Sequence, residues 1–237
     1  MAYISVLSTV ITFIFTAAVL NRYRAKGGAH LLLWGIGLAL YGLGTLMEAL
    51  MLFTFSEFGL KLWYLSGAML TAAWLGQGSL NLLVRRRGVA ASLNVTLALG
   101  SLVALILVVA APITGAAAAY NHAAPLSTQY KEILTRSGWM IFMTIILNLY
   151  GTLTLVGGAL YSAFIFWRKK VLFNRMVGNI LIAAGALFPA IGGSFVKAGL
   201  VDWLYLSELA GVLLMYVGFL QATAPQAAPK EIAQPAD

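Results

Sequence analysis

Seven apolar stretches divide this chain, and positive charge is concentrated in every second gap between them. Each stretch has about the 18 residues that a helix needs to cross a hydrocarbon core roughly 30 Å thick. The pattern predicts an all-α integral membrane protein, a seven-transmembrane-helix bundle that occupies residues 1–223. The predicted spans are residues 3–20, 31–55, 62–84, 89–112, 139–167, 177–200 and 203–222.

The basic residues predict the orientation of the bundle. The first, third and fifth gaps hold ten Lys and Arg residues, whereas the second, fourth and sixth hold four when Lys197, at the end of the sixth span, is counted with them. Cytoplasmic loops of membrane proteins carry the excess of Lys and Arg. We therefore expect the N-terminus outside, the C-terminus in the cytoplasm, and a location in a bacterial plasma (inner) membrane.

Composition removes several classes of function. Only 9% of the residues are charged, and the net charge of +8 is spread over short loops, so we expect lipid contact and no nucleic-acid binding. The chain has no cysteine, and its two histidines, His30 and His122, both fall in predicted loops. We expect no metal site and no cofactor. Residues 224–237, which hold three prolines, are predicted to be a disordered cytoplasmic tail.

A weak internal similarity flanks the fourth span. Tyr64-Leu65-Ser66 opens the third span, and Tyr205-Leu206-Ser207 opens the seventh. Basic clusters also follow both the first and the fifth spans. Two triplets of spans in the same orientation predict a parallel 3+1+3 internal duplication; chance similarity between apolar helices is the alternative interpretation.

Two acidic residues lie well inside predicted spans, where an isolated charge costs about 2.5–3.5 kcal/mol on insertion scales. Glu48 is roughly 10 Å from the outer end of its span and Glu208 roughly 8 Å, at 1.5 Å per residue. Lys197 stands near the outer end of the sixth span. The three side chains are predicted to share one layer in the outer half of the membrane. They line an outward-facing polar pocket in one interpretation; Lys197 and Glu208 form a structural ion pair in the other.

Further residues are candidates for the same pocket. Tyr41 and Thr45 lie on the helical face of Glu48, and Asn148 is a polar residue within the fifth span. Pro189 and Gly193 predict a broken or kinked sixth helix, a feature that often marks transporter sites. The alternative is that these residues are ordinary helix-packing positions and an ordinary kink.

The loop from residue 113 to residue 138 is the only long one, and its second half has apolar side chains at helical spacing. We predict a short helix on the outer surface, with Ser127 as its N-terminal cap. The helix either covers the bundle as a lid or is a plain connector.

No motif names a reaction, so the chain is not expected to be an enzyme. A retinal protein requires a lysine in the last span, and residues 203–222 contain none. The intramembrane acids and the interrupted sixth span favour a small-solute or proton-coupled transporter with a small-molecule or ion ligand. Two alternatives remain open: a seven-helix sensor that acts through a signalling partner, and an accessory subunit bound to a membrane protein partner.

Overall fold

The protein is helical throughout the part of the chain that its computed structural model covers. The structure describes residues 2–84, 86–170, 172–197 and 202–224, with the side chains at 2, 87, 190, 193–197 and 202 excepted. These residues form no strand; a single antiparallel bridge joins Ile113 and Leu134. Five helices are long and apolar enough to cross a membrane, which is consistent with an all-α, multi-pass membrane protein.

Five of the predicted spans coincide with single helices. These are α1 (Ala2–Lys26), α2 (Ala29–Met51), α5 (Arg87–Ala110), α7 (Gly138–Arg168) and α9 (Asp202–Thr223). The other two predicted spans are helical but are not among the five spanning candidates. Residues 62–84 fall in α3 (Glu57–Trp63), η1 (Tyr64–Leu70) and α4 (Thr71–Leu83), and residues 177–200 fall mostly in α8 (Phe173–Lys197). The count of seven membrane-spanning helices therefore stays a prediction.

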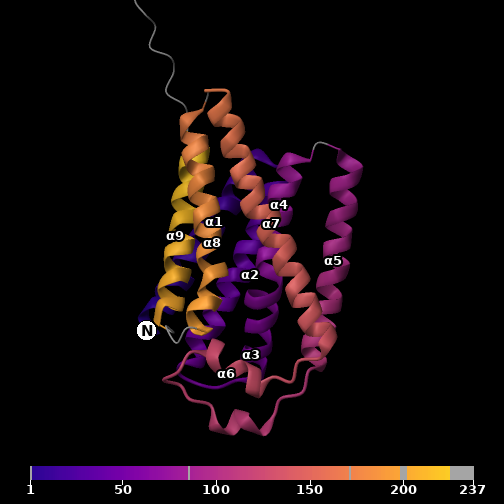
Figure 1. Ribbon diagram of the computed structural model, residues 1–237, viewed down its shortest axis with the longest axis vertical. Coiled ribbons are helices and arrows are strands. Elements are labelled where there is room, and N and C mark those ends of the chain that lie inside the picture. Colours follow the sequence, from indigo (N-terminus) through magenta and orange to yellow (C-terminus); the bar gives the residue numbers. More distant parts are fainter. Residues whose placement is uncertain (1, 85, 171, 198–201, 225–237) are drawn as a thin grey trace, which may run out of the picture.

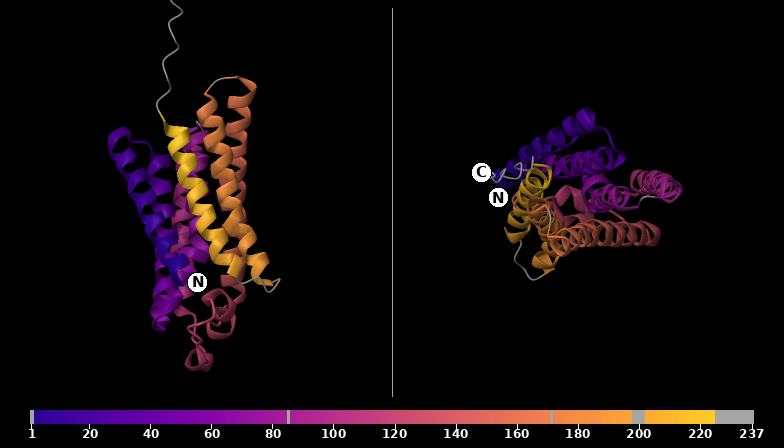
Figure 2. Two further views of the ribbon diagram at one scale, coloured as in Figure 1. Left: turned by 90° about the vertical axis from the view of Figure 1, so that its left-hand side faces the viewer. Right: turned by 90° about the horizontal axis from the view of Figure 1, so that it is seen from above.

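The helices stand roughly side by side, with α5 at one edge of the bundle (Figures 1 and 2). The closest neighbours are α8 with α9, α1 with α2, α4 with both α2 and α7, and α7 with α8. In contrast, α5 packs mainly against α4, η1 and α7. The buried side chains form two clusters, one around Tyr64 and Met140 and the other around Leu38 and Val212.

The helix ends that flank the first, third and fifth gaps, where most basic residues are found, lie together at the upper end of the bundle in Figure 1. They are the C-terminal ends of α1 and α7 and the N-terminal ends of α5 and α8, and the end of α9 lies with them. The N-terminus and the long loop between α5 and α7 lie at the opposite end. We call the basic end the inner end and the opposite end the outer end, following the predicted orientation.

The helix α8 continues through Pro189, so an unwound break in the sixth span is wrong for the residues described, whereas the predicted kink stays a prediction. The physical reason is the close approach of α9. A Cβ atom added at Gly211 would come within 2.8 Å of the Gly185 carbonyl oxygen and 2.9 Å of Pro189 Cδ. Because Pro189 has no N–H to donate to that carbonyl, the two glycines let α9 cover the exposed backbone and the ring. Small residues allow such close contact between membrane helices.

The segment η1 is π-helical, a form that often occurs at functional sites. It leaves two backbone carbonyls that accept side-chain hydrogen bonds. Thr71 Oγ1 donates to the Ser66 carbonyl at 2.8 Å, and Asn148 Nδ2 donates to the Ala68 carbonyl at 2.7 Å. A Cβ at Gly44 would lie 2.9 Å from Gly67 Cα, so α2 runs against the backbone of η1.

The long loop folds back beneath the outer end of the bundle. It contains η2 (Gly115–Ala119) and α6 (Leu126–Ile133), and Figure 1 shows α6 close to the ends of α2 and α3. The predicted short helix is confirmed, and its apolar residues Leu126, Ile133 and Leu134 are buried. The predicted cap is wrong, because Pro125 precedes the helix and Ser127 lies in its first turn.

Candidate functional site

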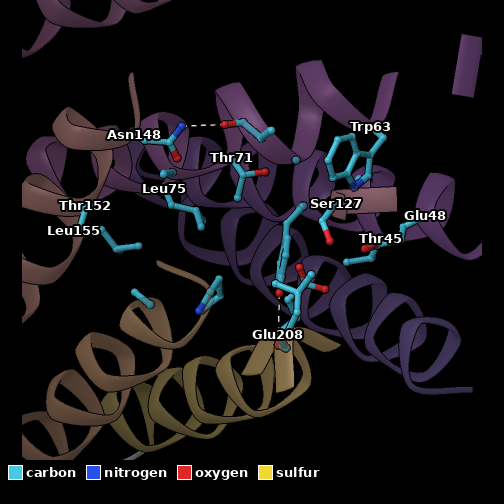
Figure 3. Close-up of a pocket in the computed structure, with 18 of the residues that line it drawn as sticks. Thr45, Glu48, Trp63, Thr71, Leu75, Ser127, Asn148, Thr152, Leu155 and Glu208 are labelled. Carbon is cyan, nitrogen blue, oxygen red and sulfur yellow. Dashed lines mark hydrogen bonds between the residues drawn. The ribbon is translucent and has the colours of Figure 1, made fainter. Parts of the chain in front are cut away.

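A cavity of about 390 Å³ lies between the outer halves of the helices and α6. Its walls come from α2, α3, η1, α4, α7, α8 and α9, and α6 lies across its outer end. Figure 3 shows Thr45 and Glu48 on one side of this space and Asn148 and Thr152 on the other. We call this cavity the outer pocket. Its polar lining residues are Tyr41, Thr45, Glu48, Thr71, Ser127, Tyr130, Lys131, Asn148, Thr152 and Glu208.

Six of the eight residues predicted for a pocket line this cavity. They are Tyr41, Thr45, Glu48, Asn148, Pro189 and Glu208. The remaining two, Gly193 and Lys197, fall in the last turns of α8, and their side chains lie outside the described residues. The predicted ion pair between Lys197 and Glu208 stays a prediction for the same reason.

Glu48 is the most unusual residue of the outer pocket. Its side chain is only 3% exposed, and its Oε1 atom has no hydrogen-bond partner. In the part of the chain that the structure describes, the only ion pair joins Lys61 and Glu57, at 2.8 Å, away from the pocket lining. The Tyr205 hydroxyl lies close enough to interact with the Glu48 carboxyl group, and neither Oε1 nor that hydroxyl has a further partner. A buried carboxyl group that no cation of the described residues faces is costly when it is ionised. Such a group is a candidate for binding a ligand.

Glu208 approaches the same space from α9. It is partly buried, and Figure 3 shows its side chain directed into the pocket. The Tyr41 hydroxyl donates to the Glu208 backbone carbonyl at 3.2 Å, which ties α2 to α9 at this level. The two carboxyl groups, 160 residues apart in the sequence, therefore face one cavity.

The other polar side chains of the pocket mostly direct their donors at backbone carbonyls. Asn148 Nδ2 donates to the carbonyls of Ala68 and Thr144, the latter at 2.8 Å. Thr45 Oγ1 donates to the Gly42 carbonyl at 3.2 Å. Together with the hydrogen bonds of Thr71 and Tyr41, this pattern leaves oxygen lone pairs as the groups that these four side chains still offer.

Aromatic residues connect α6 to the pocket. The ring of Tyr130 lies 5.3 Å from that of Trp63 and 5.7 Å from that of Tyr64, and the Arg136 guanidinium lies 5.1 Å from its centroid. Burial raises the pKa of Tyr130, against the opposing effect of Arg136. These contacts hold α6 across the outer end of the pocket, and we call α6 the lid.

The lid loop also approaches Glu48 through η2 and the residues that follow it. The ring of Tyr120 stacks edge-on against that of His122, and His122 Nδ1 lies 3.1 Å from the Met51 carbonyl at the end of α2. Burial, with a further contribution from the Glu48 carboxylate, raises the pKa of Tyr120 to about 12. The loop is therefore coupled to the buried acid electrostatically as well as by packing.

A second cavity, of about 580 Å³, lies at the inner end between α1, α2, α4, α7, α8 and α9. Three cations line it, Arg22, Lys26 and Arg175, and no acidic residue of the described chain does. Arg22 Nη2 donates to the Thr223 carbonyl at 3.3 Å. We call this space the inner cavity.

A small apolar cavity of about 20 Å³ lies between these two spaces. Its lining, which we call the apolar plug, consists of Phe15, Trp34, Leu38, Leu75, Leu155, Ile182 and Met215. Leu75, Leu155 and Met215 also line the outer pocket, whereas Trp34 and Ile182 also line the inner cavity. The three spaces therefore form a row through the bundle, closed in the middle by hydrocarbon side chains.

Several pocket residues were not among the predicted ones. Trp63 stands at a span end, a position typical of tryptophan at the membrane interface, and gave no sign of facing inward. Ser127 and Tyr130 reach the pocket only because α6 folds back under the bundle. Thr71 and the carbonyls of η1 depend on the π-helical hydrogen bonds, for which no sequence signal was found.

Comparison of the chain with protein-family models, with curated proteins and with solved structures gave no match. No group of three His, Cys, Asp or Glu side chains that could hold a metal ion occurs within the described ranges.

Proposed function

We propose that the protein is a transporter of small solutes, with the outer pocket as its solute site. The observation that carries this proposal is the row of three cavities with shared walls. A polar site that is separated from the opposite side by a short apolar constriction is the arrangement that alternating access requires. Movement of Leu75, Leu155 and Met215 would connect the pocket to the inner cavity without unfolding any helix. Coupling to protons would use the same carboxylates, Glu48 and Glu208.

The topology that belongs to this proposal is a bundle of seven spans with the N-terminus outside, in a bacterial inner membrane. The positions of α3–η1–α4 and of α8 beside spanning helices support the count. The shared inner position of the basic helix ends supports the orientation. The parallel 3+1+3 duplication is part of the proposal too, because Ser66 and Ser207 are both buried and donate to carbonyls of the preceding turn, at 2.6 and 2.7 Å.

Thiol labelling tests the orientation directly, because the chain contains no cysteine. We expect Ala123→Cys, in the lid loop, to react with a membrane-impermeant maleimide added to intact cells. Lys169→Cys, at the end of α7, should react only in inverted vesicles. The reverse pattern would overturn the N-out orientation.

The same method tests transport. Leu155 belongs to both the outer pocket and the apolar plug, so an alternating-access protein should expose Leu155→Cys to the reagent from each side in turn. Ala104→Cys on α5 is the matched control, since Ala104 is fully buried and lines none of the cavities. Labelling of Leu155→Cys from the outer side only, in every condition, would contradict transport.

A sensor is the second candidate, and the lid favours it. A solute bound beneath α6 would change the contacts of Tyr130 with Trp63 and Tyr64, which is a conformational signal at the surface. This alternative predicts solute-dependent thermal stabilisation without any flux into proteoliposomes. Flux of the stabilising solute would decide for the transporter. A stable membrane protein partner that co-purifies in mild detergent would instead favour an accessory subunit.

A further inference from the structure

We propose that the ligand of the outer pocket is a small organic cation, a protonated amine that presents N–H donors to Glu48 and to the acceptor oxygens around it. The inference rests on the proposed function only in taking the outer pocket as the solute site. It goes beyond it in assigning the chemical class of the solute, which no motif of the sequence indicates.

The first argument is the charge of the lining. Glu48 and Glu208 contribute two carboxyl groups, and Lys131, an exposed residue of the lid, is the only cation among the described lining residues. The neighbouring cations Lys61 and Arg136 already have partners and do not themselves line the pocket. Lys61 pairs with Glu57 and donates to the Val109 carbonyl at 3.1 Å, and Arg136 stacks on Tyr130. An anionic ligand would meet two carboxylates, so the pocket disfavours it.

The second argument is the hydrogen-bond inventory. The donors of Tyr41, Thr45, Thr71 and Asn148 already serve backbone carbonyls. What these side chains still offer is lone pairs, since hydroxyl and amide oxygens accept as well as donate. A ligand that brings donors satisfies these four side chains, and the hydroxyls of Ser127 and Tyr130 can accept from it as well.

The third argument is the unpartnered Oε1 atom of Glu48. The atom is fully shielded from solvent, and the Ser127 hydroxyl, which also lines the pocket, has no partner either. Buried polar atoms in folded proteins are almost always paired. An ammonium group that enters between α2 and α6 would supply a donor to Oε1 beside the neighbouring Tyr205 hydroxyl, and would neutralise the carboxylate.

The fourth argument is the shape and the walls of the pocket. A volume of about 390 Å³ lies within the range of ordinary small-molecule sites. Trp63, Tyr41 and Tyr130 contribute aromatic surface, which attracts cations through the ring quadrupole. Leu75, Leu155 and Met215 make the deep end apolar. The complementary ligand has a cationic head near Glu48 and a compact apolar body that points toward the plug.

The test is a comparison of ligands of matched shape, with the full chain in lipid nanodiscs. The probes are 2-phenylethylamine, its neutral analogue 2-phenylethanol, and the anion 3-phenylpropanoate, with butylamine as a smaller amine. We expect both amines to raise the melting temperature and to give saturable heats of binding, and we expect the alcohol and the carboxylate to bind at least tenfold more weakly. Failure of both amines to bind, or stronger binding of the anion, would overturn the proposal.

Variants locate the binding. Glu48→Gln keeps the shape of the side chain and removes its charge, so amine affinity should fall by at least tenfold. The matched control is Glu57→Gln, which removes an exposed carboxylate at the same end of the bundle and should leave affinity unchanged. Glu208→Gln serves as a second variant if Glu48→Gln does not fold. Unchanged amine affinity in the folded variants would contradict the assignment.

Flux measurements separate this inference from the proposed function. Saturable amine binding without amine uptake into proteoliposomes would overturn transport and leave the ligand class intact. Uptake of the neutral or anionic analogue, with no effect of either amine, would overturn the ligand class and leave transport intact.

Discussion

The two ends of the bundle carry opposite charge in opposite environments. At the outer end, Glu48 is buried beneath a lid and has an oxygen without a partner. At the inner end, Lys26 and Arg175 line a larger space and are themselves exposed. Exposed cations near a membrane surface are stabilised by water and anionic lipid. These cations account for the predicted orientation of the bundle, and they need no bound ligand to be stable.

The difference shows that burial, more than the number of charges, points to function. The inner end has more basic residues, yet each can be hydrated where it stands. The outer end has fewer basic residues, and its acidic residue Glu48 is buried. The apolar plug separates the outer pocket from the inner cavity. We therefore expect the largest change in function from a substitution that connects these two spaces.

The largest effect is expected from opening the plug. Leu155→Ala removes a buried side chain that separates the outer pocket from the inner cavity, and large-to-small changes of this kind cost about 2–5 kcal/mol of stability. We also expect a leak of small amines through proteoliposome membranes, because the constriction would admit water. Thermal unfolding and a dye-coupled flux assay measure the two consequences.

The control for that experiment is Leu102→Ala on α5, a large apolar residue that is 53% exposed and lines none of the three spaces. It should leave the membrane sealed. An equal leak with both variants would mean that the row of cavities is not a path.

A second comparison uses the α8–α9 interface, which extends from the outer end of the bundle toward the inner end. Gly211→Ala would press on Gly185 and Pro189 beside the outer pocket, and Gly218→Ala would press on Gly178 and Ile182 further toward the inner end. Both should lose about 1–3 kcal/mol of stability through overpacking. Only Gly211→Ala should also weaken amine binding, measured by calorimetry in nanodiscs. Equal weakening by both would indicate that the pocket senses the interface as a whole.

Features that depend on a single helix could be predicted from the sequence, whereas features that depend on contacts between helices could not. Apolar length predicted the helices, and the depth of Glu48 and Glu208 predicted that their side chains share a layer. The close packing of Gly211 on Pro189 involves a second helix, so it could not be predicted from α8 alone. The π-helical turn at Ser66 is a shift in hydrogen bonding that leaves the residue pattern of the span unchanged.

A smaller effect is expected at the lid. Tyr130→Ala removes two aromatic contacts, each worth about 0.5–1.5 kcal/mol, so α6 should close less firmly over the outer pocket. We predict that bound 2-phenylethylamine dissociates about three- to tenfold faster, because each 1.4 kcal/mol corresponds to a factor of ten. Stopped-flow Trp63 fluorescence, with the other tryptophans replaced by phenylalanine, measures the rate. Tyr161→Ala, an exposed tyrosine on α7, is the matched control.

The smallest effect is expected at the inner cavity. If an amine leaves the outer pocket through the plug, it meets Arg22, Lys26 and Arg175, which repel it. Arg175→Gln should therefore raise amine flux toward that end, by about two- to fivefold at low salt, since exposed charge interactions are worth roughly 0.2–1 kcal/mol. The increase should shrink above about 0.15 M salt, where the screening length is about 8 Å, and amine binding at the outer pocket should not change. Flux measured against salt concentration checks this prediction, with Arg24→Gln as the control because Arg24 lies outside the cavity lining. A salt-independent increase, or an equal increase with the control, would show that the two ends do not act on the same solute.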